Sequence, residues 1–199
     1  MSFRKEKKIK LTISDNYKFI DLQKNNKANK LYNKREVNSI YFDNSALDMF
    51  HQSEEGVLPR KKIRIRWYDR QNQFNLEEKT SSVEGRFKQT KTIKNFNTIS
   101  DILSFKIFDK IYGILTPSLL VSYERSYFNL NKIRITLDEK IKYKNYRNNI
   151  NQKIVDPERV VELKTGIEIS DDYIEKLFPF TNSRFSKYSR GLLFTEGKL

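Results

Sequence analysis

The sequence contains no cysteine, and His51 is its one histidine among 199 residues. The absence of cysteine excludes a disulfide framework, a thiolate metal site and a cysteine nucleophile. A single histidine excludes a histidine-rich zinc site and argues against a Ser-His catalytic triad. Any metal ion that the protein binds must therefore be held by carboxylates.

Long apolar runs are also missing. The first residues, MSFRKEKKIKLTIS, include no apolar stretch of signal-peptide length, and no later window approaches a membrane span. We therefore expect a cytoplasmic protein, with association with a membrane through a partner left open. The composition shows no break along the chain, so we expect a single domain over residues 1–199. The sequence does not indicate the oligomeric state.

Negative charge is scarce relative to positive charge. The chain has 39 lysines and arginines against 25 aspartates and glutamates, which gives a formal net charge of +14. Because there is a single histidine, this charge changes little across physiological pH. The partner is therefore expected to be an anion: nucleic acid, anionic lipid, or a phosphorylated small molecule or polymer.

What the sequence does have is strands with one charged and one apolar face. In RKKIRIRWYD, residues 60–69, an extended chain places Lys62, Arg64 and Arg66 on one side. Ile63 and Ile65 fall on the other side, together with the tryptophan that follows them. An ordinary half-buried strand would leave the arginine row in water, and this reading explains the stretch when it is taken alone.

The same alternation recurs in strands far apart in the sequence, at 132–139 and 160–164. Glutamate and lysine stand two residues apart three times: Glu6 with Lys8, Glu77 with Lys79, and Glu162 with Lys164. If helices cover the apolar faces, the charged faces line the inside of a barrel. A solvated outer face stays open as the alternative.

The element pattern is that of an antiparallel sheet with helices. Expected strands cover 4–12, 36–44, 61–68, 74–80, 86–93, 118–128, 132–141 and 160–165. Expected helices cover 15–24 with Ser14 as N-cap, 45–52, 98–113 with Gly113 as the stop, 170–178, and 184–191 ending at Gly191. Residues 24–34 are expected to form a polar loop.

A lumen lined with cations alone would be costly, because like charges repel and lose their hydration. An anionic ligand relieves both costs. Carboxylates spaced among the cations, at Glu6, Glu77, Asp138 and Glu162, offer oxygen ligands to a hard divalent cation. A polyphosphate chain with Mg²⁺ or Mn²⁺ is the ligand that this pattern suits.

Eight short motifs carry a family resemblance: FRKEKK, VNSIYFDN, KIRIRWY, LEEKT, YERSYF, KIRITLDE, VVELK and FSKYSRG. In order and approximate spacing they resemble the VTC domain, the polyphosphate polymerase branch of the triphosphate tunnel metalloenzyme superfamily. The resemblance implies an α+β fold, an eight-stranded antiparallel β-barrel with flanking helices. It implies that the tunnel binds ATP with Mn²⁺ or Mg²⁺ and transfers the terminal phosphoryl group to a growing polyphosphate chain.

The resemblance also implies roles for particular residues. The catalytic, phosphate-contacting residues are expected to be Lys8, Arg64, Arg66, Lys79, Arg125, Arg134 and Lys164. Substrate binding is assigned to Arg4, Tyr123, Lys88, Ser186 and Lys187, with Lys91 as the alternative to Lys88 because the register of that strand is open. The metal-binding glutamate corresponds to Glu162, with Glu6 and Glu77 as further candidates.

Three other functions stay open. Hydrolytic relatives commonly carry Glu-x-Glu pairs on the first and late strands, whereas this chain has lysine at the second position, in Lys8 and Lys164. Lysine there weakens metal loading and strengthens the grip on a polyanion, which favours a polymerase or a non-catalytic polyphosphate-binding subunit over a triphosphatase or tripolyphosphatase. A nucleic-acid-binding module is the least favoured, because most aromatic residues fall at core positions.

Overall fold

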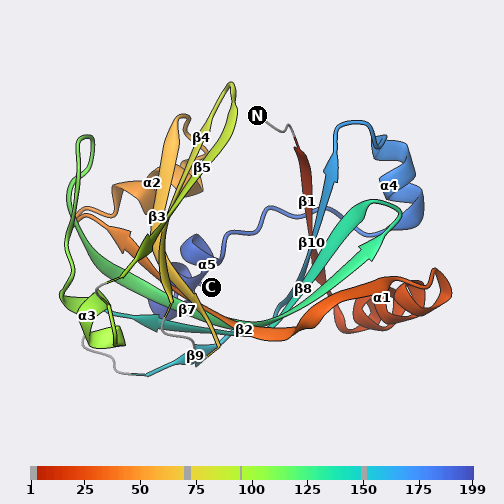
Figure 1. Ribbon diagram of the computed structural model, residues 1–199, viewed down its shortest axis with the longest axis horizontal. Helices are drawn as coiled ribbons and strands as arrows, with labels where there is room; N and C mark the ends of the chain where they lie inside the picture. The colour runs from red at the N-terminus through yellow and green to blue at the C-terminus, as the bar shows by residue number, and fades with distance from the viewer. Residues whose placement is uncertain (1–3, 70–72, 95, 149–151) are drawn as a thin grey trace. The chain divides into compact units, whose positions relative to one another are not determined.

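The computed structural model describes residues 4–69, 73–94, 96–148 and 152–199 (Figure 1). The strands are β1 (Arg4–Leu11), β2 (Asn29–Asp43), β3 (Arg60–Tyr68), β4 (Phe74–Ser82), β5 (Gly85–Ile93), β6 (Ile107–Asp109), β7 (Gly113–Leu130), β8 (Ile133–Asn145), β9 (Ile154–Val155) and β10 (Arg159–Gly166). The helices are α1 (Ile13–Asn25), α2 (Asp48–Glu55), α3 (Ile99–Ser104), α4 (Asp171–Leu177) and α5 (Lys187–Thr195). Within these ranges, no helix has the length and apolar character needed to cross a membrane.

The main path of the sheet has eight strands, in the order β1-β10-β8-β7-β2-β3-β4-β5. Strand β6 pairs with β7, and β9 pairs with β8, off this path. The chain divides into two compact units, to which β2, β7 and β8 each contribute a part. Unit 1 comprises 1–35, 123–141 and 156–185, and unit 2 comprises 36–122, 142–155 and 186–199.

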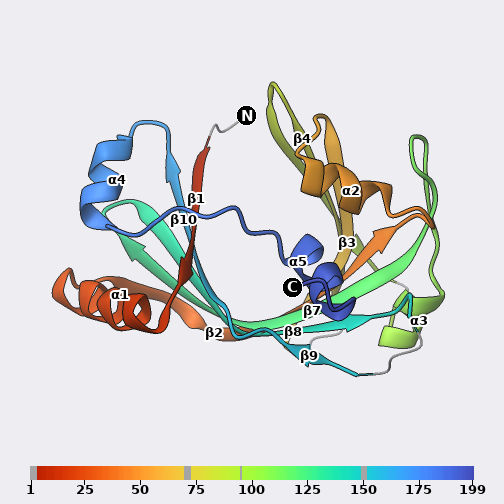
Figure 2. The same ribbon diagram turned by 180° about the vertical axis from the view of Figure 1, so that it is seen from behind.

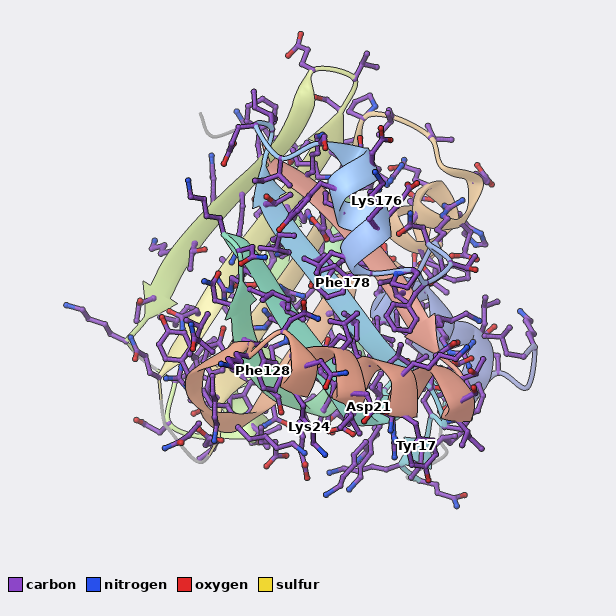
Figure 3. All side chains as sticks on the ribbon, turned by 90° about the vertical axis from the view of Figure 1, so that its right-hand side faces the viewer. Tyr17, Asp21, Lys24, Phe128, Lys176 and Phe178 are labelled. Atoms are coloured by element: carbon purple, nitrogen blue, oxygen red, sulfur yellow. The ribbon has the colours of Figure 1, made fainter. Side chains whose placement is uncertain are left out.

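In unit 1, two helices cover the apolar face of β1, β10 and β8. Ile9 pairs with Val161, and Leu163 pairs with Ile135, so these side chains lie on one face of the sheet. They form one buried cluster that also holds Phe19 of α1 and Ile174 of α4. Figure 3 shows the two helices over the strands, with Phe178 between them and Tyr17, Asp21 and Lys24 along α1. The charged residues that alternate with them, Glu6, Lys8, Glu162 and Lys164, therefore lie on the opposite face.

Unit 2 repeats this arrangement with other elements. Ile40 of β2 pairs with Ile65 of β3, which pairs with Leu76 of β4. Ile40 and Ile65 are fully buried in a cluster with Met49 of α2 and Ile102 of α3. Helix α2 lies beside β3 in both ribbon views (Figure 1, Figure 2). The apolar row of residues 60–69 is therefore the core face, as expected.

The predicted helix over 98–113 is wrong beyond its first turns. Helix α3 ends at Ser104, and residues 107–109 form β6, which pairs with the start of β7. The side chain of Asp109 accepts hydrogen bonds from the amides of Ile111 and Tyr112 at 2.9 and 3.3 Å. It also binds Lys61 Nζ at 2.7 Å. These contacts close a hairpin turn where the apolar spacing alone indicated a helix.

Three element boundaries also differ from the expectation. The polar loop predicted over 24–34 gives way to β2 at Asn29, because this exposed, polar half of the strand lacks the alternation by which strands are recognised. Thr12, and not Ser14, caps α1, since it forms a capping box with Asp15. Gly191 lies inside α5, where a Cβ atom would come 2.5 Å from Tyr143 Cδ1. The glycine permits close packing and does not end the helix.

Candidate functional site

The charged face of unit 1 carries side chains from β1, β10 and β8. Glu6 pairs across the strands with Lys164, and Lys8 pairs with Glu162. The next pairing places Thr136 opposite Glu162 and Arg134 opposite Lys164. We call this group, with Asp138 of β8 and Tyr123 and Arg125 of β7, the first cluster. In β1 and β10, each carboxylate of the cluster has a lysine directly across from it.

Arg125 is the most firmly held cation of the first cluster. Its Nε and Nη2 atoms donate to the two oxygens of Asp138 at 2.5 and 2.7 Å, and Asp138 is 1% exposed. Nη2 also lies 3.8 Å from Glu162 Oε2. Burial lowers the pKa of Arg125, but Tyr123 and Asp138 outweigh it and raise that pKa well above its usual value. The guanidinium group therefore stays charged and keeps one orientation.

Glu162 is held as a carboxylate by its neighbours. Burial raises its pKa, but a side-chain hydrogen bond with Glu6 and the charges of Lys164 and Lys8 hold the pKa well below its usual range. Lys164 Nζ lies 3.1 Å from Glu162 Oε1, and Lys8 Nζ lies 3.9 Å from Glu6 Oε1. Lys8 also donates to the carbonyl of Phe185 at 2.7 Å. Glu6 and Glu162 thus present adjacent carboxyl groups.

Glu6 and Glu162 could bind a divalent cation if a bound phosphate supplied further oxygen ligands to the ion. In the part of the chain that the structure describes, no three acidic or histidine residues gather in a way that could hold a metal ion by themselves. Magnesium in phosphate-handling sites is commonly bound by one or two carboxylates, with water and substrate phosphates completing the shell. Glu6 and Glu162 match that donor set.

The charged face of unit 2 is more basic. Lys62 of β3, Lys79 of β4 and Lys88 of β5 stand directly opposite one another in neighbouring strands. Arg64 pairs with Glu77 in the same two strands. We call these residues, with Arg66 and Tyr41, the second cluster. Lys91 pairs with Leu76 on the core face, so the register places Lys88, and not Lys91, on the charged face. That Lys88 binds substrate stays a prediction.

Glu77 is the carboxylate of the second cluster. Its Oε2 atom binds Arg64 Nη2 at 2.6 Å and lies 3.7 Å from Arg66 Nη1, and Oε1 binds Lys88 at 2.6 Å. Burial raises the pKa of Glu77, but Arg64, Arg66 and Lys88 lower it to about 2. Both oxygens are therefore engaged by cations. That Glu77 binds a metal stays a prediction. Its ion pairs favour a structural role, in which Glu77 holds the neighbouring cations in place.

The sequence did not single out Tyr41, which lies on the same face of β2. Arg64 Nη1 donates to its hydroxyl at 2.8 Å, and its ring stacks on that of Tyr188 with centroids 4.8 Å apart. Burial raises the pKa of Tyr41, but Arg64, Arg66 and Lys62 lower it to about 8. The signal was present, because Ser39, Tyr41 and Asp43 alternate with Ile40 and Phe42.

Ser186 and Lys187 begin helix α5. Ser186 is its N-cap and accepts a hydrogen bond from Lys62 Nζ at 2.8 Å, which joins it to the second cluster. Lys187 is the first residue of the helix. Arg4 begins β1, but its side chain lies outside the part of the chain that the structure describes.

The structure therefore groups the candidate residues in two sets. Unit 1 brings together Glu6, Lys8, Tyr123, Arg125, Arg134, Glu162 and Lys164. Unit 2 brings together Arg64, Arg66, Glu77, Lys79 and Lys88, with Ser186 reached through Lys62. Each set combines cations with carboxylates on a face from which the core side chains point away.

Comparisons with known proteins agree on one fold. A family model described as VTC domain matches residues 4–195. Three solved structures are similar. A conserved hypothetical protein from Pyrococcus furiosus has a TM-score of 0.56 and 15% sequence identity, and the match covers 94% of this chain and 99% of that protein. PH1819 from Pyrococcus horikoshii has a TM-score of 0.54 and 16% identity, with 98% and 99% covered, and HpAC1 from Hippeastrum has a TM-score of 0.55 and 16% identity, with 99% and 97% covered. HpAC1 is described as an adenylyl cyclase candidate with a dominant triphosphatase activity. Among curated proteins, none matches this sequence.

At these identities the solved structures carry the fold and nothing further. The fold is the triphosphate tunnel fold, so the predicted antiparallel sheet of eight strands with flanking helices is confirmed. The family match spans both compact units.

Proposed function

This chain belongs to the VTC domain family, and from that membership we propose that it transfers the terminal phosphoryl group of ATP to a growing inorganic polyphosphate chain. The two clusters supply what such a reaction requires. Phosphoryl transfer depends on positioning and on stabilisation of negative charge, with little covalent chemistry left to the protein. The end of a phosphate chain is already anionic at neutral pH, so the reaction needs no strong general base.

The observation that carries the proposal is the row of three lysines across β3, β4 and β5. Lys62, Lys79 and Lys88 stand directly opposite one another, and Arg64 and Arg66 lie on the same face. Like charges directly opposite in a sheet are destabilising. Glu77 neutralises part of this charge, and a bound polyphosphate would neutralise more of it. An electrostatic arrangement that costs stability without a ligand is expected where the ligand is a polyanion.

In the first cluster, the proposal assigns each group a separate part. Asp138 holds the guanidinium of Arg125 in place, so that its remaining donor capacity can bind phosphate oxygens without reorganisation. Lys8 and Lys164 add positive charge beside it. Glu6 and Glu162 would hold a divalent cation, Mn²⁺ or Mg²⁺, which supplies neutralisation of the phosphate charge.

The pairing of β1 with β10 favours polymerisation over hydrolysis. Each of the two glutamates there has a lysine across from it, in the pairs Glu6 with Lys164 and Lys8 with Glu162. Two cations in these positions compete with a second metal ion and strengthen the hold on a long polyanion. A triphosphatase that relies on two metal ions would gain from carboxylates there instead.

The test is a product analysis. The purified chain is incubated with ATP and Mn²⁺ or Mg²⁺, and ADP, long-chain phosphate and orthophosphate are quantified together. ADP with long-chain phosphate supports the proposal. Orthophosphate as the sole product would make the chain a triphosphatase, and stoichiometric binding without product would make it a polyphosphate-binding subunit.

A pair of lysine variants ties the activity to the second cluster. Lys62→Ala removes one member of the lysine row, whereas Lys110→Ala removes the same charge from an exposed position in the same unit. We expect turnover and tripolyphosphate affinity to fall in Lys62→Ala and to persist in Lys110→Ala. Equal effects of the two variants would show that net charge, and not the cluster, binds the polyanion.

A further inference from the structure

Unit 1 contains a group of stacked arginine and tyrosine side chains beside the first cluster, formed by Tyr32 and Arg35 of β2, Tyr127 of β7 and Arg134 of β8. The guanidinium carbon of Arg35 lies 5.3 Å from the centroid of the Tyr32 ring and 6.0 Å from that of Tyr127. Arg134 lies 5.9 Å from the Tyr127 centroid. The two tyrosine rings meet edge to face, with centroids 5.6 Å apart. Two arginines therefore converge on one aromatic pair.

The two arginines differ from the other cations of this face in their partners. Among the residues that the structure describes, neither Arg35 nor Arg134 has a carboxylate within salt-bridge distance. Arg125, in contrast, binds Asp138, and Lys164 binds Glu162. The positive charge of Arg35 and Arg134 is balanced only by ring faces, so an anion bound there would meet little competition.

The four side chains differ in their solvent exposure, so one is a buried support and others are accessible to a ligand. Tyr127 is 5% exposed and is fixed within the unit, whereas Tyr32 is 51% exposed. Arg35 is exposed as well. A flat group could therefore stack on the Tyr32 ring or on the guanidinium plane of Arg35 without displacing core side chains. A ligand that is at once aromatic and anionic suits such a surface.

The register connects this group to the phosphate-binding residues. Arg134 pairs with Lys164, which pairs in turn with Glu6, so this cross-strand row runs from β8 to β1 with two cations followed by one carboxylate. Phosphates bound along that row would leave the attached nucleoside near Tyr127. We propose that Tyr32 and Arg35 form a base-binding platform, which stacks the nucleobase of a nucleoside triphosphate while Arg134 binds its phosphate oxygens. This inference rests on the proposed function. The platform would allow the site to bind a nucleotide in preference to inorganic polyphosphate, which has no base.

Calorimetric titration of the full chain with ATP and with inorganic tripolyphosphate tests the platform. Stacking contributes to ATP binding alone, so Tyr32→Ala should weaken ATP binding by about tenfold. Binding of tripolyphosphate, which has no base, should stay as in the unaltered chain. Tyr32→Phe keeps the ring and should bind both ligands as the unaltered chain does. GTP should depend on Tyr32 as ATP does, because stacking tolerates different bases.

The matched control is Tyr17→Ala. Tyr17 lies on α1 of the same unit and is 66% exposed, so its loss removes a comparable ring away from the cluster (Figure 3). Equal loss of affinity for both ligands in Tyr32→Ala would overturn the platform and make the position a phosphate subsite or a structural one. No loss for either ligand would overturn it as well. Failure of the unaltered chain to bind tripolyphosphate would instead overturn the proposed function.

Discussion

Arg64 donates from Nη1 to the hydroxyl of Tyr41 at 2.8 Å, while its Nε and Nη2 atoms bind Glu77 at 2.8 and 2.6 Å. One guanidinium group thus joins β2, β3 and β4 on the charged face of unit 2. Because the Tyr41 ring stacks on Tyr188, whose hydroxyl donates to the buried Asp43 at 2.7 Å, the arginine is positioned by a chain of contacts that ends in the core. Such a group can meet a phosphate without reorganising.

The first prediction concerns the ionisation of Tyr41. An ordinary tyrosine has a pKa of 10.0, and the cations around Tyr41 lower its pKa to about 8. We expect ultraviolet difference spectra to show a tyrosinate transition near that pH, absent in Tyr41→Phe and kept in Tyr17→Phe. Bound tripolyphosphate cancels the charge of Arg64 and should move the transition to higher pH.

The same shift has a consequence for stability. When the pKa of a group is lower in the folded chain than in the unfolded chain, its ionisation stabilises the fold. This contribution is fully present above the pKa of the unfolded chain and is lost as the pH falls through the pKa of the folded chain. The free energy of unfolding should therefore gain a contribution between pH 8 and pH 10, which Tyr41→Phe removes. An unchanged pH profile in that variant would show that Tyr41 does not ionise in the folded chain.

The second prediction concerns Glu77, whose pKa falls from an ordinary 4.5 to about 2. Its stabilising contribution is present above pH 4.5 and is lost as the pH falls towards 2. Glu77→Gln leaves the surrounding cations without their carboxylate, and should lower the free energy of unfolding at neutral pH by about 3 kcal/mol. Chemical denaturation across the acidic range measures both effects.

The adjacent residue supplies the control for that experiment. Glu78 points to the opposite face, where it binds Lys61 at 2.9 Å, and it is 35% exposed on its side chain. Glu78→Gln should cost much less than Glu77→Gln. Tripolyphosphate should restore more stability to Glu77→Gln than to the control, because it replaces the missing negative charge. The reverse order would contradict the assignment of Glu77 as the carboxylate that neutralises the second cluster.

The sequence was sufficient to predict which face is charged in β3, β8 and β10. Alternation with a period of two is set by the strand backbone itself, so Arg64 and Ile65 had to lie on opposite faces wherever the strand was placed. It was not sufficient to predict which cations would meet which carboxylates. That depends on register, and a shift of one residue would have placed Lys91 rather than Lys88 beside Glu77.

Tertiary contacts explain the errors in the element pattern. Short apolar runs do not distinguish a helix from a strand by spacing alone, and the run after Ser104 became a hairpin because Asp109 closes the turn and Lys61 neutralises it. Gly191 was read as a helix stop, whereas the structure shows that a side chain there would overlap Tyr143 and Leu119. Tyr41 was missed because its partners come from β3 and α5, far away in the sequence.

The third prediction contrasts the two faces of β3. Arg66 donates from Nε to Ser39 at 3.0 Å and lies on the charged face, whereas Ile65 is fully buried in the core. Arg66→Ala should keep the fold and weaken binding of ATP and tripolyphosphate, because each charge-assisted contact to phosphate contributes roughly 1.5–3 kcal/mol. Ile65→Ala should lower the free energy of unfolding by roughly 2–5 kcal/mol.

Thermal shifts with and without tripolyphosphate, at low salt, separate these outcomes. We expect a reduced ligand-induced shift in Arg66→Ala. In Ile65→Ala we expect a lower melting temperature and a normal shift. An Arg66→Ala chain that responds to the ligand as the unaltered chain does would show that the arginine row contributes nothing to binding.

The last prediction separates metal binding from phosphate binding in the first cluster. Glu162→Gln keeps the volume of the side chain and removes a charge that Lys164, Lys8 and Arg125 surround. If Glu162 holds the divalent cation, metal-dependent turnover should fall by orders of magnitude. Binding of polyphosphate without metal should persist or tighten, because the cations then lose a competitor. Glu158→Gln, which removes a carboxylate bound to Lys10 in the same unit, should change neither measurement.

Glu6→Gln decides between the two carboxylates of this pair. Because the carboxyl groups of Glu6 and Glu162 are adjacent, each of them is a candidate for the main ligand of the cation. If turnover in Glu6→Gln recovers at raised Mn²⁺ while Glu162→Gln stays inactive, Glu162 is the main ligand and Glu6 its support. If Glu162→Gln keeps full turnover, the assignment of Glu162 is wrong, and the cation must be held by Glu6 or by Glu77 in the second cluster.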